Sequence, residues 1–292
     1  MEKGSGLWTK QTTTNEKEKK VLKQTSKKEV PIGMGTMKSR RKPHYTPPSN
    51  EEFARRYGSG EKFEIEAITK EEFNGLHVIH FALDASPSMA GEFPHLVDAV
   101  NEVSIPALKG VKTADKKAMR LSCSLFSGRI VPSWLGYRSP WQLGKEQLNE
   151  STFKSAGYDY THLYEAIIEG RRSIDGAMRC YKSQNRMARE KEGLVVGRLL
   201  VFTDGANYSP TAGVQLTPND VRRELTRNNG YTLRTVLVYF ETGGGIKESE
   251  IKNLALNQMG FKEVWYFGDK DTLENRRRAF RHSLNLWSSK SE

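Results

Sequence analysis

The sequence predicts an α/β domain built on a doubly wound, mostly parallel sheet of six strands with one antiparallel edge strand. Two patterns indicate this class. Short apolar runs alternate along the chain with stretches whose apolar residues recur at helical spacing, which is the order expected of a sheet with helices on both faces. The first run, residues 76–84, is almost continuously apolar, as in a strand that is buried on both sides.

The first half of the domain is expected to hold three strands and a helix. After the opening strand, residues 93–108 show helical spacing. Residues 119–126 alternate apolar and more polar side chains, which predicts a strand covered on one face. A turn then leads into a strand at 129–135, where Pro132 lacks a backbone N–H, so this strand belongs antiparallel at an edge of the sheet.

The second half repeats the alternation of helix and strand. A helix opens near Thr161, and its apolar residues form one stripe. The remaining elements are expected as strands at 198–204, 232–241 and 263–267, helices at 218–228 and 247–259, and a last helix carrying Phe280, Leu284 and Trp287.

Residues 1–62 are interpreted as a basic arm and linker, and residues 63–292 as the domain. Residues 1–60 hold 14 Lys and Arg against 6 Asp and Glu, a net +8 of the chain's +11. The first 50 residues have too few apolar side chains to offset the entropy of ordering them, so the arm is predicted to be mostly disordered until something binds it.

Composition indicates an intracellular protein. No apolar stretch approaches the ~20 residues that span a bilayer, and the lysine-rich start lacks the apolar core of a signal peptide. A cytoplasmic location without membrane contact is expected. Cys123 and Cys180 have neither zinc-ligand spacing nor the density of a disulfide scaffold, so both are predicted to be reduced and structural.

Three segments far apart in sequence carry the candidate site. Asp84, Ser86 and Ser88 follow the first strand, Thr161 opens a helix, and Asp204 closes the strand at 198–204. Parallel sheets bind ligands beyond the carboxyl ends of their strands, so these loops are expected to meet there. Mg²⁺ takes six oxygens and keeps several waters, which suits two carboxylates and three hydroxyls. The sequence therefore predicts a site for Mg²⁺ or Mn²⁺.

This pattern resembles the metal-ion-dependent adhesion site (MIDAS) of the von Willebrand factor A (VWA) domain, in which Asp-x-Ser-x-Ser is joined by a Thr and an Asp from later loops. The resemblance implies a Rossmann-like VWA fold for residues 63–292 and an intact MIDAS at the five residues above. One departure is present. The family has small residues just before the Thr, whereas this chain has Tyr158, Asp159 and Tyr160, so the tyrosines are expected to narrow access to the metal and Asp159 to weaken its attraction for an outside ligand.

The resemblance implies a non-enzymatic, cation-dependent protein-interaction module. Its partner would offer an acidic side chain to the metal, and the chain would act as an adaptor or subunit of a larger assembly, beside an AAA+ ATPase. The alternative is a nucleic-acid-associated protein that holds phosphates with the arm and with a basic surface at residues 171–198, while the metal site recruits a protein. The simpler interpretation of residues 171–198 is a solvated helix and its loop.

Enzymatic functions fit the motifs less well. Aspartyl-phosphate phosphatases need a second acid two residues after the nucleophile, and here that position is Ser86, which cannot act as a general acid at neutral pH. A two-metal nuclease would need more carboxylates. No P-loop pattern occurs. The glycines at 243–245 follow a strand and open a helix, where a phosphate can bind, but such a run is more often a flexible loop. The chain is therefore not expected to be an enzyme.

Overall fold

The computed structural model describes the greater part of the predicted domain. The described residues are 65–66, 76–106, 118–145, 148–153, 156, 160–184, 195–205, 207, 216–242 and 246–268. The chain divides into two units, Met1–Arg41 and Lys42–Glu292, and every described residue belongs to the second. The predicted arm, the boundary at residues 62 and 63 and the last helix lie outside the described residues, so they stay predictions.

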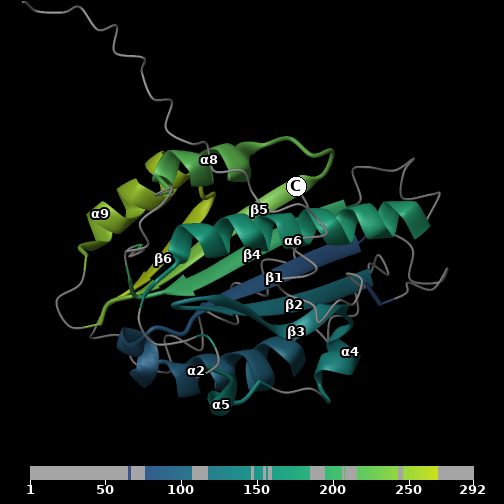
Figure 1. Cartoon of the computed structure of the whole chain (residues 1–292), viewed down its shortest axis with the longest axis horizontal. Coiled ribbons are helices and arrows are strands. Elements are labelled where there is room, and N and C mark those ends of the chain that lie inside the picture. Colours follow the sequence, from purple (N-terminus) through teal and green to yellow (C-terminus); the bar gives the residue numbers. More distant parts are fainter. Residues whose placement is uncertain are drawn as a thin grey trace, which may run out of the picture. The chain divides into compact units, whose positions relative to one another are not determined.

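The described strands form one six-stranded sheet in the order β3-β2-β1-β4-β5-β6 (Figure 1). The strands are β1 (Leu76–Asp84), β2 (Ala118–Phe126), β3 (Ile130–Arg138), β4 (Val195–Thr203), β5 (Thr232–Phe240) and β6 (Glu263–Phe267). All neighbouring pairs are parallel except β2 and β3, which are antiparallel. The predicted fold class is confirmed, including the antiparallel strand at one edge.

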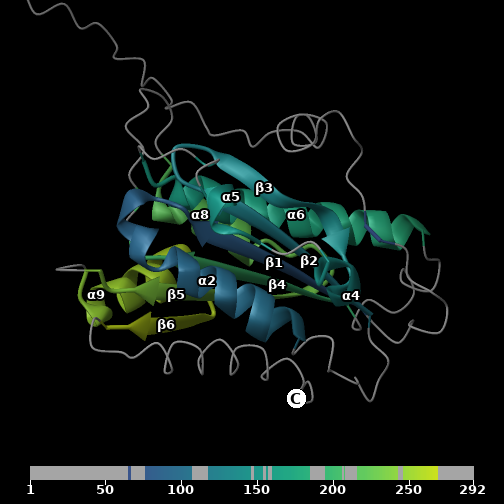
Figure 2. The same cartoon turned by 90° about the horizontal axis from the view of Figure 1, so that it is seen from below.

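Helices cover both faces of this sheet. The helical elements are η2 (Pro87–Gly91), α2 (Phe93–Asp98), η3 (Ala99–Ser104), α4 (Pro140–Leu143), α5 (Glu150–Phe153), α6 (Leu163–Gln184), α8 (Pro218–Thr226), α9 (Glu248–Lys252) and η6 (Asn253–Met259). Figures 1 and 2 show α6, α8 and α9 on one face, and α2, α4 and α5 on the other. Each face encloses its own hydrophobic core.

The central strand β1 supplies side chains to both cores. Ile79, Phe81 and Leu83 pack on the side of α2, whereas Val78 and Ala82 pack on the side of α6. Successive side chains of a strand point to opposite faces, so a strand between two helical layers must be apolar along its whole length. All nine residues of β1 are buried, as the continuous apolar run predicts.

Strand β2 differs from the expectation of a half-covered strand, because all nine of its residues are buried. Its polar side chains find partners instead of solvent. Arg120 Nε donates to the backbone carbonyl of Glu66 at 2.9 Å, and Ser124 Oγ lies 2.9 Å from His80 Nε2. The polar residues that alternate with apolar ones in β2 therefore form hydrogen bonds inside the protein, and neither face of the strand is open to water.

Strand β3 occupies the edge, where Pro132 was expected. Its pairing with β2 contains register shifts, between Leu121 and Cys123 and again between Cys123 and Ser124. A short segment joins its outer side: Ile65 pairs with Tyr137, and the Glu66 N–H donates to the Tyr137 carbonyl at 2.8 Å. A missing N–H is tolerated at this position, since an edge strand uses only one row of its ladder bonds inside the sheet.

Helix α6 is the longest described element, with 22 residues, and it lies close against the sheet. Gly170 makes the close approach possible. A Cβ at this position would lie 2.8 Å from Leu199 Cδ1 and 3.0 Å from His80 Cδ2, closer than side chains normally pack. The helix therefore crosses β1 and β4 at a distance that only glycine allows.

Candidate metal centre

The loop after β1 carries the first three candidate residues. Asp84 is the last residue of β1, and the backbone N–H of Ser86 donates to Asp84 Oδ1 at 2.8 Å. Short polar residues favour such turns because their side chains bind nearby backbone groups. Ser86 has an extended backbone, and Pro87 then opens the short helix η2. The Ser86 and Ser88 hydroxyls end up 3.1 Å apart.

The loop after β4 is fastened to the loop after β1. Thr203, the last residue of β4, donates from Oγ1 to Asp84 Oδ2 at 2.6 Å. The same oxygen accepts the backbone N–H of Gly205 at 3.1 Å. Strands β1 and β4 are neighbours in the sheet, and the chain continues from them in opposite directions, to β2 and to β5. The candidate residues thus gather at the switch point where ligands bind in sheets of this class.

Asp204 lies within hydrogen-bond distance of donors from two other loops. Ser88 Oγ donates to Asp204 Oδ1 at 3.0 Å, which joins the loops after β1 and β4. Thr242, two residues after β5, donates from Oγ1 to Asp204 Oδ2 at 2.6 Å. Both carboxylate oxygens of Asp204 therefore have a hydroxyl donor.

Thr161 approaches the same place from the start of α6. A Cβ placed on Gly205 would lie 3.7 Å from Thr161 Oγ1, so the Thr161 hydroxyl adjoins the residue that follows Asp204. The backbone N–H of His162 donates to the Ser127 carbonyl at 3.2 Å, and Ser127 Oγ donates to the Tyr160 carbonyl at 2.9 Å. These bonds fasten the Thr161 loop to the end of β2.

The structure thus brings all five predicted residues together at the carboxyl edge of the sheet. Asp84, Ser86, Thr161 and Asp204 are buried, and Ser88 is exposed. Two threonines that hold the aspartates, Thr203 and Thr242, were not predicted as site residues. The available signal was a hydroxyl residue at or just after the end of a parallel strand, but turns contain such residues too often for that signal to single them out.

The electrostatics of the two aspartates favour a positively charged ligand. Burial raises the pKa of Asp84 to about 7; hydrogen bonds from Thr203 and Ser86 oppose the rise, and the charge of Asp204 adds to it. Burial also raises the pKa of Asp204, against the hydrogen bonds from Thr242 and Ser88. Among the described residues, neither aspartate forms an ion pair with a basic side chain. A cation would supply the missing counter-charge.

The donor set fits a hard cation. It contains two carboxylates and three hydroxyls, the oxygen ligands that Mg²⁺ and Mn²⁺ take. Within the described ranges, no three or more His, Cys, Asp or Glu side chains gather as a metal cluster. The candidate site has two carboxylates and otherwise hydroxyls, so it would not count as such a cluster. The role of the five residues as ligands stays a prediction.

The rim of the site carries Tyr160 and His162. Tyr160 is 38% exposed, and its ring meets the His162 ring edge-on, with centroids 6.5 Å apart. His162 Nδ1 lies 3.6 Å from Glu165 Oε1. His162 directly follows Thr161 and is partly buried. Tyr158 and Asp159 lie outside the described residues, so their predicted effect on access is untested.

The predicted basic surface at residues 171–198 needs correction. Arg171 and Arg198 are buried, with 1% and 4% of their area exposed. Arg172 lies within 3.2 Å of Glu224 across the gap to α8. These three basic residues therefore do not form an open surface, because Arg171 and Arg198 are buried and Arg172 is paired with Glu224 of α8. Residues 185–194 lie outside the described part.

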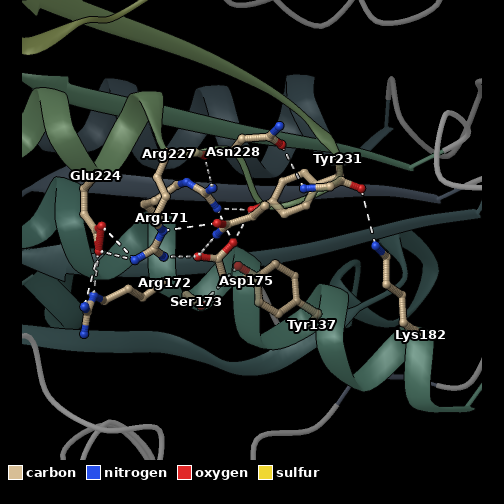
Figure 3. A network of polar contacts seen from close by, with 12 residues as sticks. Tyr137, Arg171, Arg172, Ser173, Asp175, Lys182, Glu224, Arg227, Asn228 and Tyr231 are labelled. Atoms are coloured by element: carbon tan, nitrogen blue, oxygen red, sulfur yellow. Dashed lines mark hydrogen bonds and ion pairs between the residues drawn. The ribbon is translucent and has the colours of Figure 1, made fainter. Parts of the chain in front are cut away.

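Arg171 belongs to a buried polar network that fastens α6 to α8 and to the start of β5 (Figure 3). Asp175 is its centre: it binds Arg171 and accepts from Arg227 Nη2 at 2.7 Å, from Asn229 Nδ2 at 2.7 Å and from the Tyr231 hydroxyl at 2.5 Å. Although burial acts to raise the pKa of Asp175, the charge of Arg171 and these hydrogen bonds hold it below its usual value. The network lies before β5, at the end of the sheet opposite the candidate metal centre.

Other predictions concern the cysteines and the membrane. Cys123 is buried and Cys180 is partly buried, and no disulfide joins the two. No helix in the described ranges is both long and apolar enough to span a membrane. The glycines at 243–245 lie outside the described residues.

Comparisons with known proteins show distant similarity only. No family model matches the chain, and no curated protein matches its sequence. Among solved structures, it is similar to the PilB minor pilin of Streptococcus sanguinis, with 11% identity, a TM-score of 0.46, and coverage of 76% of this chain and 63% of that one. It is similar to BatB of Bacteroides thetaiotaomicron, a conserved hypothetical protein, with 16% identity, a TM-score of 0.42 and coverage of 74% and 100%.

A third similar structure is proximal thread matrix protein 1 of the mussel byssus, with a zinc-occupied MIDAS motif, at 17% identity, a TM-score of 0.41 and coverage of 73% and 46%. The chain thus spans about three-fifths of the pilin and less than half of the mussel protein. At TM-scores below 0.5, these likenesses establish neither a family nor a function for this chain.

Proposed function

We propose that this chain is a VWA-type, divalent-cation-dependent protein-interaction module rather than an enzyme. One observation carries the proposal. Asp84 ends β1, and Asp204 directly follows the neighbouring strand β4. The Ser86 and Ser88 hydroxyls connect them, with 3.1 Å between the two hydroxyls and 3.0 Å from Ser88 to Asp204. Such an oxygen-rich cluster at the switch point suits Mg²⁺ or Mn²⁺.

Each residue has a distinct task in this proposal. Asp84 and Asp204 supply the two negative charges, and Ser86, Ser88 and Thr161 supply neutral oxygens. Thr203 holds the Asp84 carboxylate with its 2.6 Å hydrogen bond. When bound, the cation supplies a coordination position for an acidic side chain of the partner. The exposed Ser88 and Tyr160 mark the side from which the partner approaches.

The partner proposal follows from the same site. A carboxylate is the hard, negative oxygen ligand that protein surfaces offer to such a cation. We therefore propose an adaptor or subunit role in a larger assembly, and the resemblance to VWA proteins extends the proposal to an assembly containing an AAA+ ATPase. The location proposed for this role is the cytoplasm.

The alternative, binding of nucleic acid, has less support in the described residues. Arg171 and Arg198 are buried and Arg172 is paired, so the 171–198 surface loses three of its cations. Lys182 donates to the Gly230 carbonyl at 3.3 Å. The arm lies outside the described residues. The retention experiment described next therefore also tests for nucleic-acid binding.

The experiment compares proteins retained by the immobilised full chain in Mg²⁺ and in chelator. Thr161→Val removes one proposed oxygen ligand while keeping the side-chain shape, and Ser183→Ala removes an exposed hydroxyl near the far end of α6 as the matched control. A partner that binds wild type and Ser183→Ala in Mg²⁺, but neither wild type in chelator nor Thr161→Val, supports the proposal. Equal retention in chelator contradicts it, and retention that nuclease or salt abolishes indicates the alternative.

A further inference from the structure

Thr242 is placed to control how the Asp204 carboxylate coordinates a cation. It follows β5, the strand beside β4, and its hydroxyl donates to Asp204 Oδ2 at 2.6 Å. Ser88, itself a proposed ligand, donates to the other oxygen, Oδ1, at 3.0 Å. The side of the carboxylate that carries Oδ1 therefore adjoins the proposed ligands, while Oδ2 is engaged by a residue outside that set.

With Oδ2 hydrogen-bonded to Thr242, the Asp204 carboxylate can coordinate a cation through Oδ1 alone more readily than through both oxygens. This restriction matters differently to different cations. Ca²⁺ takes six to eight oxygens and often binds carboxylates through both oxygens, whereas Mg²⁺ takes six and binds them through one or keeps water between. Engaging Oδ2 thus disfavours the coordination that Ca²⁺ prefers and leaves the coordination of Mg²⁺ intact.

We infer that Thr242 is a positioning residue that sets the preference of the site for Mg²⁺ over Ca²⁺. The inference rests on the proposed cation site. It goes further by assigning selectivity to a residue outside the five-residue motif, because the hydroxyl comes from a third loop, after β5.

Thr203 has a parallel role at Asp84, since it donates to Oδ2 at 2.6 Å, but it is a poorer residue to test. It is fully buried, it directly precedes Asp204, and it also accepts the Gly205 N–H. Replacing it would disturb the loop itself. Thr242 is only partly buried, so its hydroxyl can be removed with less disturbance of the fold.

The experiment measures Mg²⁺ and Ca²⁺ affinity by calorimetry for the full chain and four variants. Thr242→Val removes the hydroxyl, Thr242→Ala removes it without adding a methyl group, and Thr242→Ser restores it. Thr235→Val is the matched control: Thr235 is a buried threonine of β5 whose Oγ1 accepts the Lys262 N–H at 3.0 Å. Seven residues along a strand place it roughly 20 Å from the site.

We expect Thr242→Val and Thr242→Ala to bind Mg²⁺ about tenfold more weakly than wild type. Metal affinity usually falls by about this factor when a residue that orients a metal ligand is removed. Ca²⁺ affinity should fall less or rise, so the ratio of Ca²⁺ to Mg²⁺ affinity increases. Thr242→Ser should keep the wild-type ratio. Thr235→Val should lower the melting temperature in chelator without changing the ratio.

Two results would overturn the inference while leaving the cation site in place: an unchanged ratio in both Thr242→Val and Thr242→Ala, or a Thr242→Ser variant that behaves like Thr242→Val. A wild-type chain that binds no Mg²⁺, Mn²⁺ or Ca²⁺ overturns the cation site and the inference together. Circular dichroism in chelator confirms that each variant is folded.

Discussion

At the residue scale, the proposed ligands divide into charges and hydroxyls. Water can replace a serine oxygen in a metal site, but water carries no charge and therefore cannot replace a lost carboxylate. The hydrogen bonds from Thr203 and Thr242 orient the two carboxylates but add no charge.

Replacing the carboxylates should therefore abolish the response to metal. We expect Asp84→Asn and Asp204→Asn to lose the rise in melting temperature that Mg²⁺ produces in wild type, and Ser88→Ala to keep part of it. Thermal unfolding with Mg²⁺ and with chelator measures the difference. A full Mg²⁺ response in Asp204→Asn would exclude Asp204 as a ligand.

The titration of His80 should produce a measurable pH dependence of the free energy of unfolding. It is buried, with Nε2 at 2.9 Å from Ser124 Oγ and Nδ1 at 3.3 Å from the Tyr137 hydroxyl. Burial lowers its pKa to about 3, from 6.5. Between these pH values the unfolded chain holds a proton that the folded chain does not. His80 thus stabilises the fold above pH 6.5, and the contribution shrinks as the pH falls below that value.

The test compares wild type with His80→Gln, whose amide can both donate and accept hydrogen bonds. Between pH 7 and pH 5, the free energy of unfolding of wild type should fall by about 2 kcal/mol more than that of the variant. Asp84, with its raised pKa, changes stability in the opposite direction, but it is present in both proteins. Equal pH dependence in urea unfolding would show that His80 is not held neutral.

At the element scale, the segment at residues 65–66 belongs to the fold. Ile65 is 7% exposed and packs in the core on the α6 side. The Glu66 carboxylate accepts from the Ser139 N–H at 2.6 Å and from the Ser139 hydroxyl at 2.9 Å. The Glu66 carbonyl accepts from Arg120. These contacts join the segment to β2, to β3 and to the residue before α4.

Two truncations should therefore differ in stability. Deleting residues 1–50 should leave the melting temperature nearly unchanged, because that arm has little apolar surface to bury. Deleting residues 1–70 should lower it by about 5 °C or more, because it also removes a buried isoleucine and the Glu66 bonds. A loss of several degrees in the shorter deletion would show that the arm packs on the domain.

At the scale of the whole molecule, two polar clusters lie at opposite ends of the sheet. The candidate metal centre follows the ends of β1, β4 and β5, and the network around Asp175 precedes β5 (Figure 3). A strand of nine residues separates them by roughly 25 Å. Stability and cation binding should thus respond to different substitutions.

Asp175→Ala tests this separation. It leaves Arg171 buried without its main carboxylate, so we expect the free energy of unfolding to fall by about 3 kcal/mol or more, with Mg²⁺ affinity unchanged. Arg223→Ala is the control, because it breaks the exposed Arg223–Asp220 ion pair and should cost less than about 1 kcal/mol. Urea unfolding and calorimetry give the two quantities. A parallel loss of Mg²⁺ affinity in Asp175→Ala would show that the clusters are coupled.

Much of the architecture follows from local sequence. The apolar run of β1, Pro132 at the edge and the helical spacing of α6 all predicted elements that the structure confirms. That the five candidate residues gather at one edge of the sheet could also be predicted, because each lies near the end of a strand or the start of a helix. Parallel strands bring those ends together whatever the details of packing.

Only the tertiary structure decided which polar side chains are buried and what they bind. The sequence by itself determined that Arg171 is charged and lies on a helix, four residues before Asp175. Its other partners, the Arg227 carbonyl and the Tyr231 hydroxyl, reach it only because α8 and β5 pack beside α6. Thr242 likewise reaches Asp204 only because β5 lies beside β4. Hydrogen bonds between residues distant in sequence depend on the arrangement of the elements, and no local pattern of residue types records that arrangement.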